Sequence, residues 1–250
     1  MQIFDSHFHI IDKNYPLIPG KGYIPPTFTT SDYLTRTRDL NICGGTVVSG
    51  SFQGFDQEYL VSALSALGEN FVGVTQIPLN TSGDEIYRLN EAGVRAVRFN
   101  IERGGSETIE NLEKLALKVY ELCSWHVELY IDSSKLSNYF GLISDLPSVS
   151  IDHLGLSKSG FNTLLNLVEK GVKVKATGFG RMDFDIKSAM KEIVSVNQDA
   201  LMFGTDLPST RAPRPFRNDD IDFIRETFNE EVCGKIFYEN AKSFYIIKKR

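Results

Sequence analysis

The chain has 250 residues, of which 42% are hydrophobic and 24% charged, a composition typical of a globular domain with a sizeable buried core. It excludes collagen-like, disordered and disulfide-stapled proteins, and the 3 cysteines lie far apart in the sequence. The 27 Lys and Arg against 32 Asp and Glu give a net charge of -5, which argues against nucleic acid as a partner. No apolar run approaches the ~20 residues of a membrane helix and no secretory signal is visible, so we expect a cytoplasmic protein without a membrane partner.

Short β-branched segments alternate with longer segments of helical period along the whole chain. We expect strands over Gln2–Phe8, Gly45–Val48, Phe71–Gln76, Arg95–Phe99, Val127–Ile131, Val149–Asp152, Val172–Ala176 and Leu201–Gly204. We expect helices over Ser31–Leu40, Asp56–Leu67, Asp84–Glu91, Glu107–Cys123, Lys135–Ile143, Phe161–Lys170, Ile186–Val196, Asp219–Phe228 and Glu231–Phe244. This alternation predicts an α/β fold, a (β/α)8 TIM barrel, in a single domain over residues 1–250. An open doubly wound sheet is the competing architecture, but no G-x-G-x-x-G motif follows the first strand.

Two further expectations concern a loop and a helix end. The segment Ile11–Thr30 is rich in Pro and Gly and too long for a simple βα connection, so we expect it to fold over the mouth of the barrel. Ser106 is a candidate N-cap for the helix predicted to start at Glu107.

Polar residues gather where the predicted strands end, which is the catalytic face of a (β/α)8 barrel. His7 and His9 lie two residues apart on the first strand and therefore face the same side. His153 follows the sixth strand and Asp206 the eighth, so of the 4 histidines only His126, at the start of its strand, is away from this rim. The other polar residues that we place at the rim and assign to the site are Ser49, Gln76, Arg98, Arg103, Tyr130 and Arg181.

Two chemistries are open to this set of residues. His7, His9, His153 and Asp206 are suitable ligands for Zn²⁺ or Mn²⁺, with a water left open for attack. Without a metal, Asp206 can act as a general base on water, while the histidines and Tyr130 polarise a carbonyl and stabilise the oxyanion. The sequence therefore predicts either no cofactor or one divalent metal ion.

The arginines indicate the charge of the substrate. Guanidinium groups hold carboxylates in a bidentate manner and stay charged when partly buried, so Arg98, Arg103 and Arg181 point to a small anionic substrate. We assign Ser49 and Gln76 to substrate binding beside them. The sequence does not indicate an oligomeric state.

Several motifs, in order along nearly the whole chain, resemble the amidohydrolase superfamily in its 2-pyrone-4,6-dicarboxylate lactonase-like branch. They are Asp5-x-His7-x-His9, Val97-Arg98-Phe99-Asn100, the strand with Tyr130, Asp152-His153-Leu154-Gly155, Lys175-Ala176-Thr177-Gly178 and Phe203-Gly204-Thr205-Asp206-Leu207-Pro208.

The resemblance implies a hydrolase that opens a small carboxylated lactone, with Asp206 activating water and Arg98 and Arg181 holding carboxylates. It also implies that His7, His9, His153 and Tyr130 contact the scissile carbonyl or a substrate carboxylate. The lactonase is similar to a metal-free enzyme, whereas relatives in the superfamily bind a divalent metal through the same histidines.

Two alternatives to the lactonase remain open. One is a mononuclear metal-dependent amidohydrolase or decarboxylase acting on another small anionic substrate, and bound metal would distinguish it. The other is a non-catalytic barrel that only binds a metabolite; it is disfavoured because a pure binder has little need of a base opposite three histidines.

Overall fold

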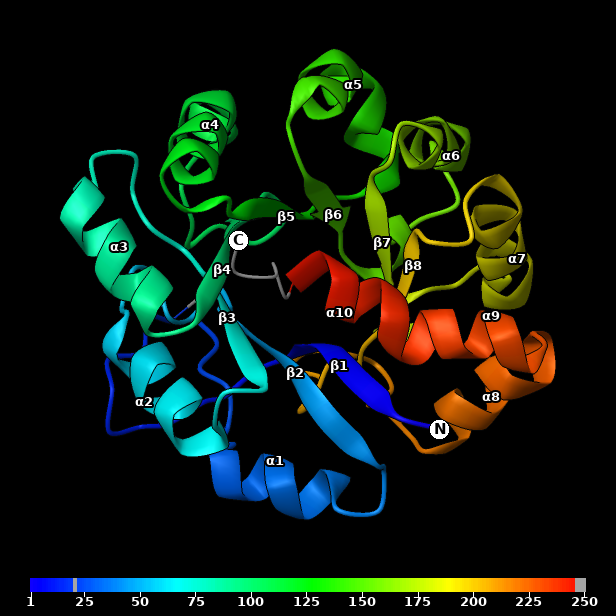
Figure 1. Ribbon diagram of the computed structural model, residues 1–250, viewed down its shortest axis with the longest axis horizontal. Coiled ribbons are helices and arrows are strands. Elements are labelled where there is room, and N and C mark those ends of the chain that lie inside the picture. Colours follow the sequence, from blue (N-terminus) through cyan, green and yellow to red (C-terminus); the bar gives the residue numbers. More distant parts are fainter. Residues whose placement is uncertain (20–21, 246–250) are drawn as a thin grey trace.

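The computed structural model describes residues 1–19 and 22–245, which form a barrel of eight parallel strands surrounded by helices (Figure 1). The strands are β1 (Ile3–Phe8), β2 (Ile42–Val48), β3 (Phe71–Thr75), β4 (Val94–Asn100), β5 (His126–Tyr130), β6 (Val149–Ile151), β7 (Lys173–Ala176) and β8 (Leu201–Phe203). Each strand pairs in parallel with the next one along the chain, in the order β1 to β8. The predicted TIM barrel is confirmed, and the open doubly wound sheet is excluded.

Helices follow the strands and cover the outside of the barrel (Figure 1). They are α1 (Thr30–Thr37), α2 (Glu58–Leu67), α3 (Gly83–Glu91), α4 (Leu112–Cys123), α5 (Leu136–Asp145), α6 (Phe161–Glu169), α7 (Ile186–Val196), α8 (Asp219–Thr227), α9 (Glu230–Gly234) and α10 (Asn240–Tyr245). Among the described residues, every helix is too short or too polar to cross a lipid bilayer.

Most predicted helices differ from the observed ones by one to three residues at their ends, and two of them differ in character as well. The helix expected from Glu107 begins as a 3-10 turn at Ile109 and continues as α4. Ser106 is not its N-cap, because the Ser106 hydroxyl accepts a 2.7 Å hydrogen bond from the backbone N–H of Asn100 and is therefore engaged at the end of β4. The last expected helix is divided by a π-helical turn, Lys235–Glu239, between α9 and α10.

A single buried carboxylate closes the barrel between its first and last strands. Asp5 in β1 accepts hydrogen bonds from the backbone N–H of Thr205 at 2.8 Å and from the Thr205 hydroxyl at 2.7 Å. It also accepts from the Tyr33 hydroxyl of α1 at 3.0 Å. Burial raises the pKa of Asp5 to about 6, against the opposing effect of these donors. Asp5 therefore fixes the position of the segment that leads to Asp206.

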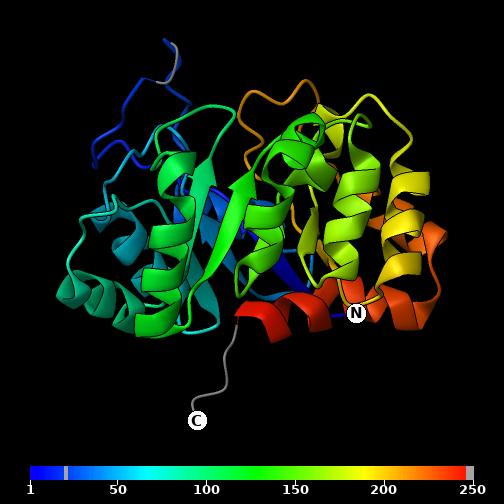
Figure 2. The same cartoon turned by 90° about the horizontal axis from the view of Figure 1, so that it is seen from above.

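The floor of the barrel is apolar and is completed by the end of the chain. Figures 1 and 2 show α10 lying across the end of the barrel where the strands begin. There Ala241 and Tyr245 join a cluster of inward side chains, Phe4, Val48, Val72, Val74, Ala96 and Met202. The Tyr245 ring stacks on Phe4 with the centroids 5.7 Å apart. The base of the barrel is therefore sealed, which leaves the opposite end for a site.

The opposite end of the barrel carries the long loops. The segment after β1 and the segment after β8 project from this end in Figure 2. The loop predicted over Ile11–Thr30 includes Gly20, which lies outside the described residues. Its described part is anchored by a bridge between Ile11 and Phe28 and by a 2.7 Å hydrogen bond from the Ile18 N–H to the Phe52 carbonyl.

We predict that Gly204→Ala destabilises the barrel. A Cβ at Gly204 would lie 2.8 Å from the backbone N and 2.9 Å from the Cβ of His7, so β1 must shift to accommodate it. Overpacking of this kind costs about 1–3 kcal/mol, to be measured as the free energy of unfolding in urea. Gly141→Ala in α5 is the control, because a Cβ there meets no atom within 4 Å and is expected to stabilise by about 0.5–1 kcal/mol. An unchanged unfolding free energy for Gly204→Ala would contradict the close approach.

Candidate active site

Three histidines converge on one carboxylate oxygen at the C-terminal end of the strands. The Nε2 atoms of His7, His9 and His153 each lie 3.9 Å from Oδ1 of Asp206. His7 ends up next to both other rings, with centroids 5.0 Å from His9 and 4.9 Å from His153. All four residues are buried. The four residues predicted as metal ligands, which are also four of the five predicted catalytic residues, are thus brought together.

Two of these residues have a strained backbone. His153 has φ 51° and Asp206 has φ 58°, in the left-handed region that non-glycine residues rarely adopt. Such conformations cost about 1–3 kcal/mol each and persist only where the surroundings hold them, which is common at functional sites. For Asp206 the restraint is a 2.7 Å hydrogen bond from its own N–H to the carbonyl of His7.

The two oxygens of Asp206 have different surroundings. Oδ2 pairs with Arg181, at 2.9 Å from Nε and 2.7 Å from Nη2. Oδ1 is buried and has no hydrogen-bond partner in the described part of the chain. Burial raises the pKa of Asp206 to about 6, although Arg181 opposes the shift. One oxygen is therefore fixed, and the other is available to a proton or a cation.

Burial disfavours the charged form of all three histidines. Burial, and then the charge of Arg98, lowers the pKa of His9 to about 3. Burial also lowers the pKa values of His7 and His153 well below the ordinary histidine range. His9 Nδ1 lies 2.6 Å from the Val48 carbonyl, to which it must donate, so its Nε2 presents a lone pair to the site.

Arg98 forms a second ion pair below the rim. Its Nη2 lies 2.7 Å from Oδ2 of Asp152, and its Nη1 donates to the Ser49 carbonyl at 2.7 Å. Burial would raise the pKa of Asp152, but Arg98, followed by His7 and Lys175, outweighs it and holds the pKa well below the ordinary value. The charges of Arg98 and Arg181 are thus both balanced within the protein.

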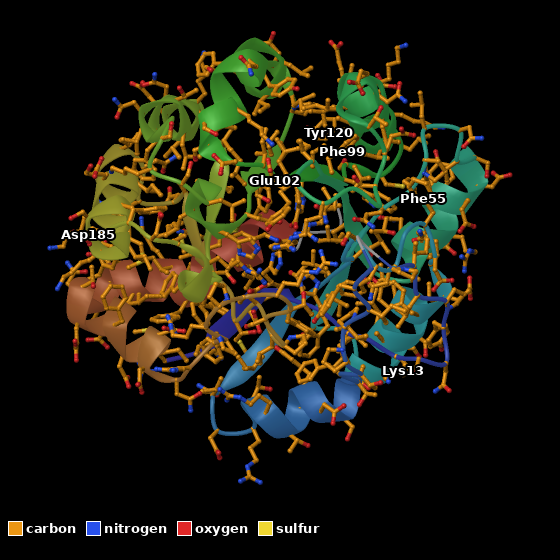
Figure 3. All side chains as sticks on the ribbon, turned by 180° about the vertical axis from the view of Figure 1, so that it is seen from behind. Lys13, Phe55, Phe99, Glu102, Tyr120 and Asp185 are labelled. Atoms are coloured by element: carbon orange, nitrogen blue, oxygen red, sulfur yellow. The ribbon has the colours of Figure 1, made fainter. Side chains whose placement is uncertain are left out.

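A cavity opens above these residues at the mouth of the barrel. Figure 3 is seen from the side opposite to Figure 1 and so faces this end of the barrel. Phe55 and Glu102 are labelled there, on the loops that follow β2 and β4. The cavity is lined by His9, Gly50, Ser51, Phe52, Arg98, Asn100, Arg103, Tyr130, His153, Arg181, Thr210 and Arg211. The Arg103 guanidinium lies over the Tyr130 ring, 5.7 Å from its centroid, and its Nε donates to the Tyr130 hydroxyl at 3.2 Å. Arg103 pairs with no carboxylate in residues 1–19 and 22–245.

Two residues predicted to bind substrate lie outside the cavity lining. The Ser49 hydroxyl is turned toward α2, where it lies 2.5 Å from the Tyr59 hydroxyl. The Gln76 amide donates to the carbonyls of Gly50, Gly54 and Gly105 at 2.9–3.1 Å and so supports the loops of the mouth. Both side chains have structural hydrogen bonds that leave them no contact with the cavity.

The sequence analysis assigned no role to three charged residues beneath the site: Glu128, which it did not single out, and Asp152 and Lys175, which it named only within motifs. All three are fully buried inside the barrel. Glu128 and Lys175 each lie between two apolar strand residues, which face the helices, so strand alternation places the charged side chains in the barrel interior. An acid and a base at such positions on two strands are a signal that could have identified the pair.

Two overlapping groups of buried residues have the geometry to hold a divalent metal ion. The ligand atoms of His7, His9 and Asp206 all lie within 4.8 Å of one another, as do those of His7, Asp152 and His153. Imidazole and carboxylate are ligands of Zn²⁺ and Mn²⁺. His7 Nε2 and Asp206 Oδ1 are buried without hydrogen-bond partners among the described residues, as atoms that bind a metal would be. His7, His9 and Asp206 could therefore hold such an ion, with His153 Nε2 3.9 Å from the same carboxylate oxygen.

The fold and the rim of histidines define a (β/α)8 barrel with a candidate active site, and comparison with known proteins identifies its family. The family model described as amidohydrolase matches residues 4–247. The chain therefore belongs to the amidohydrolase family, as the resemblance of the sequence motifs predicted.

Similar proteins include hydrolases of different bonds. A 2-pyrone-4,6-dicarboxylate hydrolase from Comamonas testosteroni is 27% identical over 156 residues, which span 60% of this chain but only 51% of that relative. A structure from Acinetobacter baumannii, described as a "probable 2-pyrone-4,6-dicarboxylic acid hydrolase" with citric acid bound, has a TM-score of 0.84 at 20% identity, covering 98% of this chain and 99% of that one. A beta-aspartyl dipeptidase from Fervidobacterium islandicum has a TM-score of 0.71 at 15% identity, covering 97% and 74%. At these identities the structural likeness establishes the fold alone.

Proposed function

We propose that this protein hydrolyses a small carboxylated lactone, with Asp206 as the general base. The observation that carries the proposal is the asymmetry of Asp206, whose Oδ2 is bound by Arg181 while its buried Oδ1 faces three neutral imidazoles. The name of the Comamonas testosteroni relative supports a lactone of the pyrone dicarboxylate class.

In the proposed reaction, water is activated between Asp206 and the histidines. Asp206 Oδ1 accepts a proton from a water molecule, and the water oxygen attacks the lactone carbonyl carbon. A base is most effective when its pKa is near the working pH, and burial brings the pKa of Asp206 to about 6. The ring C–O bond then breaks, and the proton passes to the departing oxygen.

The carbonyl oxygen gains negative charge during the attack and needs hydrogen-bond donors. Tyr130 lines the cavity beside His153, with ring centroids 5.4 Å apart. Because the Tyr130 hydroxyl already accepts a hydrogen bond from Arg103, its own proton is available to donate to the oxyanion. His9 and His153 line the same cavity and complete the polar environment of the carbonyl, while His7 lies against both of their rings.

Arg103 is assigned the main contact with a substrate carboxylate. Arg98 and Arg181 also line the cavity, but each already balances a buried aspartate. Arg103, on the loop after β4, also lines the cavity. In the part of the chain that the structure describes, this arginine has no carboxylate partner. Its guanidinium can therefore take a carboxylate in a bidentate manner, with Arg98 and Arg181 adding positive potential.

Asp206→Asn tests the base. The amide retains the shape but cannot accept the proton, so we expect kcat for a responsive pyrone carboxylate lactone to fall by at least ~100-fold. Asp132→Asn is the matched control at another strand end, because the Asp132 carboxylate is engaged by Ser134 and Ser157 at 2.6–2.9 Å. Unchanged turnover in Asp206→Asn would refute the assignment.

Arg103→Met tests the carboxylate contact. Loss of a charge-assisted hydrogen bond costs about 1.5–3 kcal/mol, so we expect KM to rise roughly 10- to 150-fold. Arg225→Met removes an exposed arginine of α8 that pairs with Asp222, and it should leave KM unchanged. Equal KM values for the Arg103 variant and the wild type would show that the substrate carboxylate binds elsewhere.

A second candidate function is a mononuclear metal-dependent hydrolase or decarboxylase acting on another small anionic substrate. The observation that favours it is the group of His7, His9 and Asp206, in which His7 Nε2 and Asp206 Oδ1 are buried without hydrogen-bond partners among the described residues. A bound Zn²⁺ or Mn²⁺ would lower the pKa of a water molecule and polarise a carbonyl.

Elemental analysis separates the two candidates. For the metal-free lactonase we expect the purified, tag-free protein to contain far less than one Zn, Mn, Fe or Ni per chain and to keep its full activity in chelator. About one ion per chain, with activity lost on chelation and restored by Zn²⁺ or Mn²⁺, would establish the second candidate instead.

A further inference from the structure

A buried ion pair lies directly beneath His7. The ammonium Nζ of Lys175 in β7 is 2.5 Å from Oε2 of Glu128 in β5 and 3.3 Å from Nδ1 of His7. It is also 3.6 Å from Oδ1 of Asp152, a distance at which the attraction is electrostatic rather than a hydrogen bond. None of these four side chains is exposed to solvent, and the proposed reaction uses neither Lys175 nor Glu128.

Glu128 is itself fixed from the floor of the barrel. The Tyr245 hydroxyl of α10 donates to Oε1 of Glu128, and His126 Nε2 lies 3.3 Å from the same oxygen. The remaining oxygen, Oε2, takes Lys175. The position of the ammonium group under His7 is therefore set by residues from β5 and α10, and not by the site above.

Two neighbours compete for Nδ1 of His7. Lys175 can only donate to this nitrogen, which must then be unprotonated, so that the proton of the neutral ring is on Nε2. Asp152 Oδ1 is also 3.3 Å away but has no hydrogen-bond partner among the described residues. It can only accept, so a hydrogen bond to it would require the proton on Nδ1 and a lone pair on Nε2. The two hydrogen bonds are mutually exclusive for a neutral ring, and they give His7 opposite properties in the site.

Geometry favours Lys175 as the partner, because its contact with Nδ1 is a hydrogen bond, whereas Oδ1 of Asp152 has no hydrogen-bond partner among the described residues. With the proton on Nδ1, the buried ammonium would keep Glu128 as its only hydrogen bond within 3.5 Å, and the Nε2 lone pair would face the Asp206 carboxylate oxygen 3.9 Å away. With the proton on Nε2, Lys175 has two acceptors and the N–H points toward Asp206 Oδ1. Asp152 still has Arg98 on its other oxygen at 2.7 Å.

We propose that Lys175, held by Glu128, is a positioning residue that keeps His7 in its Nε2–H form. His7 is then a hydrogen-bond donor in the site, whereas His9, which donates Nδ1–H to the Val48 carbonyl, is an acceptor there. In the proposed hydrolysis His7 donates to the developing oxyanion and His9 accepts from the attacking water. This division of roles rests on the proposed function, but the proton position on His7 does not.

The test is nuclear magnetic resonance of the protein labelled with ¹⁵N-histidine. Long-range ¹H–¹⁵N spectra distinguish protonated from unprotonated ring nitrogens, and comparison with a His7→Asn spectrum assigns the His7 signals among the 4 histidines. For the wild type we expect His7 Nε2 in the protonated region and Nδ1 in the unprotonated region. The metal content of the same sample is measured, so the result is separate from any assay of lactone hydrolysis.

The variant arm removes the ion pair as a unit. Either substitution alone would leave an unpaired charge buried in the barrel. The double variant Lys175→Met with Glu128→Gln removes both charges and avoids this. Asp152 then becomes the partner of Nδ1, so we expect the two His7 nitrogen signals to exchange regions. Tyr245→Phe is the control in the same network: it removes the hydroxyl from Glu128 but leaves Lys175 in place, and the His7 signals should stay as in the wild type.

The outcomes are decisive in each arm. Wild-type His7 with its proton on Nδ1 overturns the proposal without any variant. An unchanged His7 pattern in the folded double variant also overturns it, because Asp206 rather than Lys175 would then set the proton. Loss of lactone hydrolysis with the expected wild-type spectrum would instead count against the proposed function and leave the role of Lys175 intact.

Discussion

The pairing of opposite charges inside the barrel is the interaction on which the site depends. An unpaired buried ion costs several kcal/mol, so each charge in this interior requires a close partner. The shortest contacts are 2.5 Å between Lys175 and Glu128, 2.7 Å between Arg98 and Asp152 and 2.7 Å between Arg181 and Asp206. Because these pairs are balanced, three histidines can stay neutral between them, and neutral imidazole is the form that can donate, accept or bind a metal.

The side chains inside the barrel form three layers of different chemical character. The lowest layer is apolar and is sealed by α10, the middle layer holds Glu128, Lys175 and Asp152, and the upper layer holds the histidines and Asp206. The charge of Lys175 is balanced within the middle layer. In the proposed function, recognition of an anionic substrate therefore depends on the arginines that line the mouth, such as Arg103.

The sequence predicts the barrel and the converging residues well, because both depend on local periodicity and on where strands end. His7, His9, His153 and Asp206 meet because parallel strands end at the same rim. What a strand end cannot specify is the direction in which a side chain turns. Ser49 turns outward to Tyr59, and Arg98 and Arg181 are committed to aspartates that are distant in sequence. Likewise, Ser106 could not be distinguished from a helix cap because its actual partner is the backbone of a preceding strand.

The seal at the base also keeps the interior dry. Tyr245 reaches Glu128 across 117 residues of sequence. Without α10 the barrel would be open at its base, and water could reach Glu128 and Lys175. The cost of drying this ion pair is therefore coupled to the docking of α10, which buries Tyr245 and Ala241 against Phe4 and Met202.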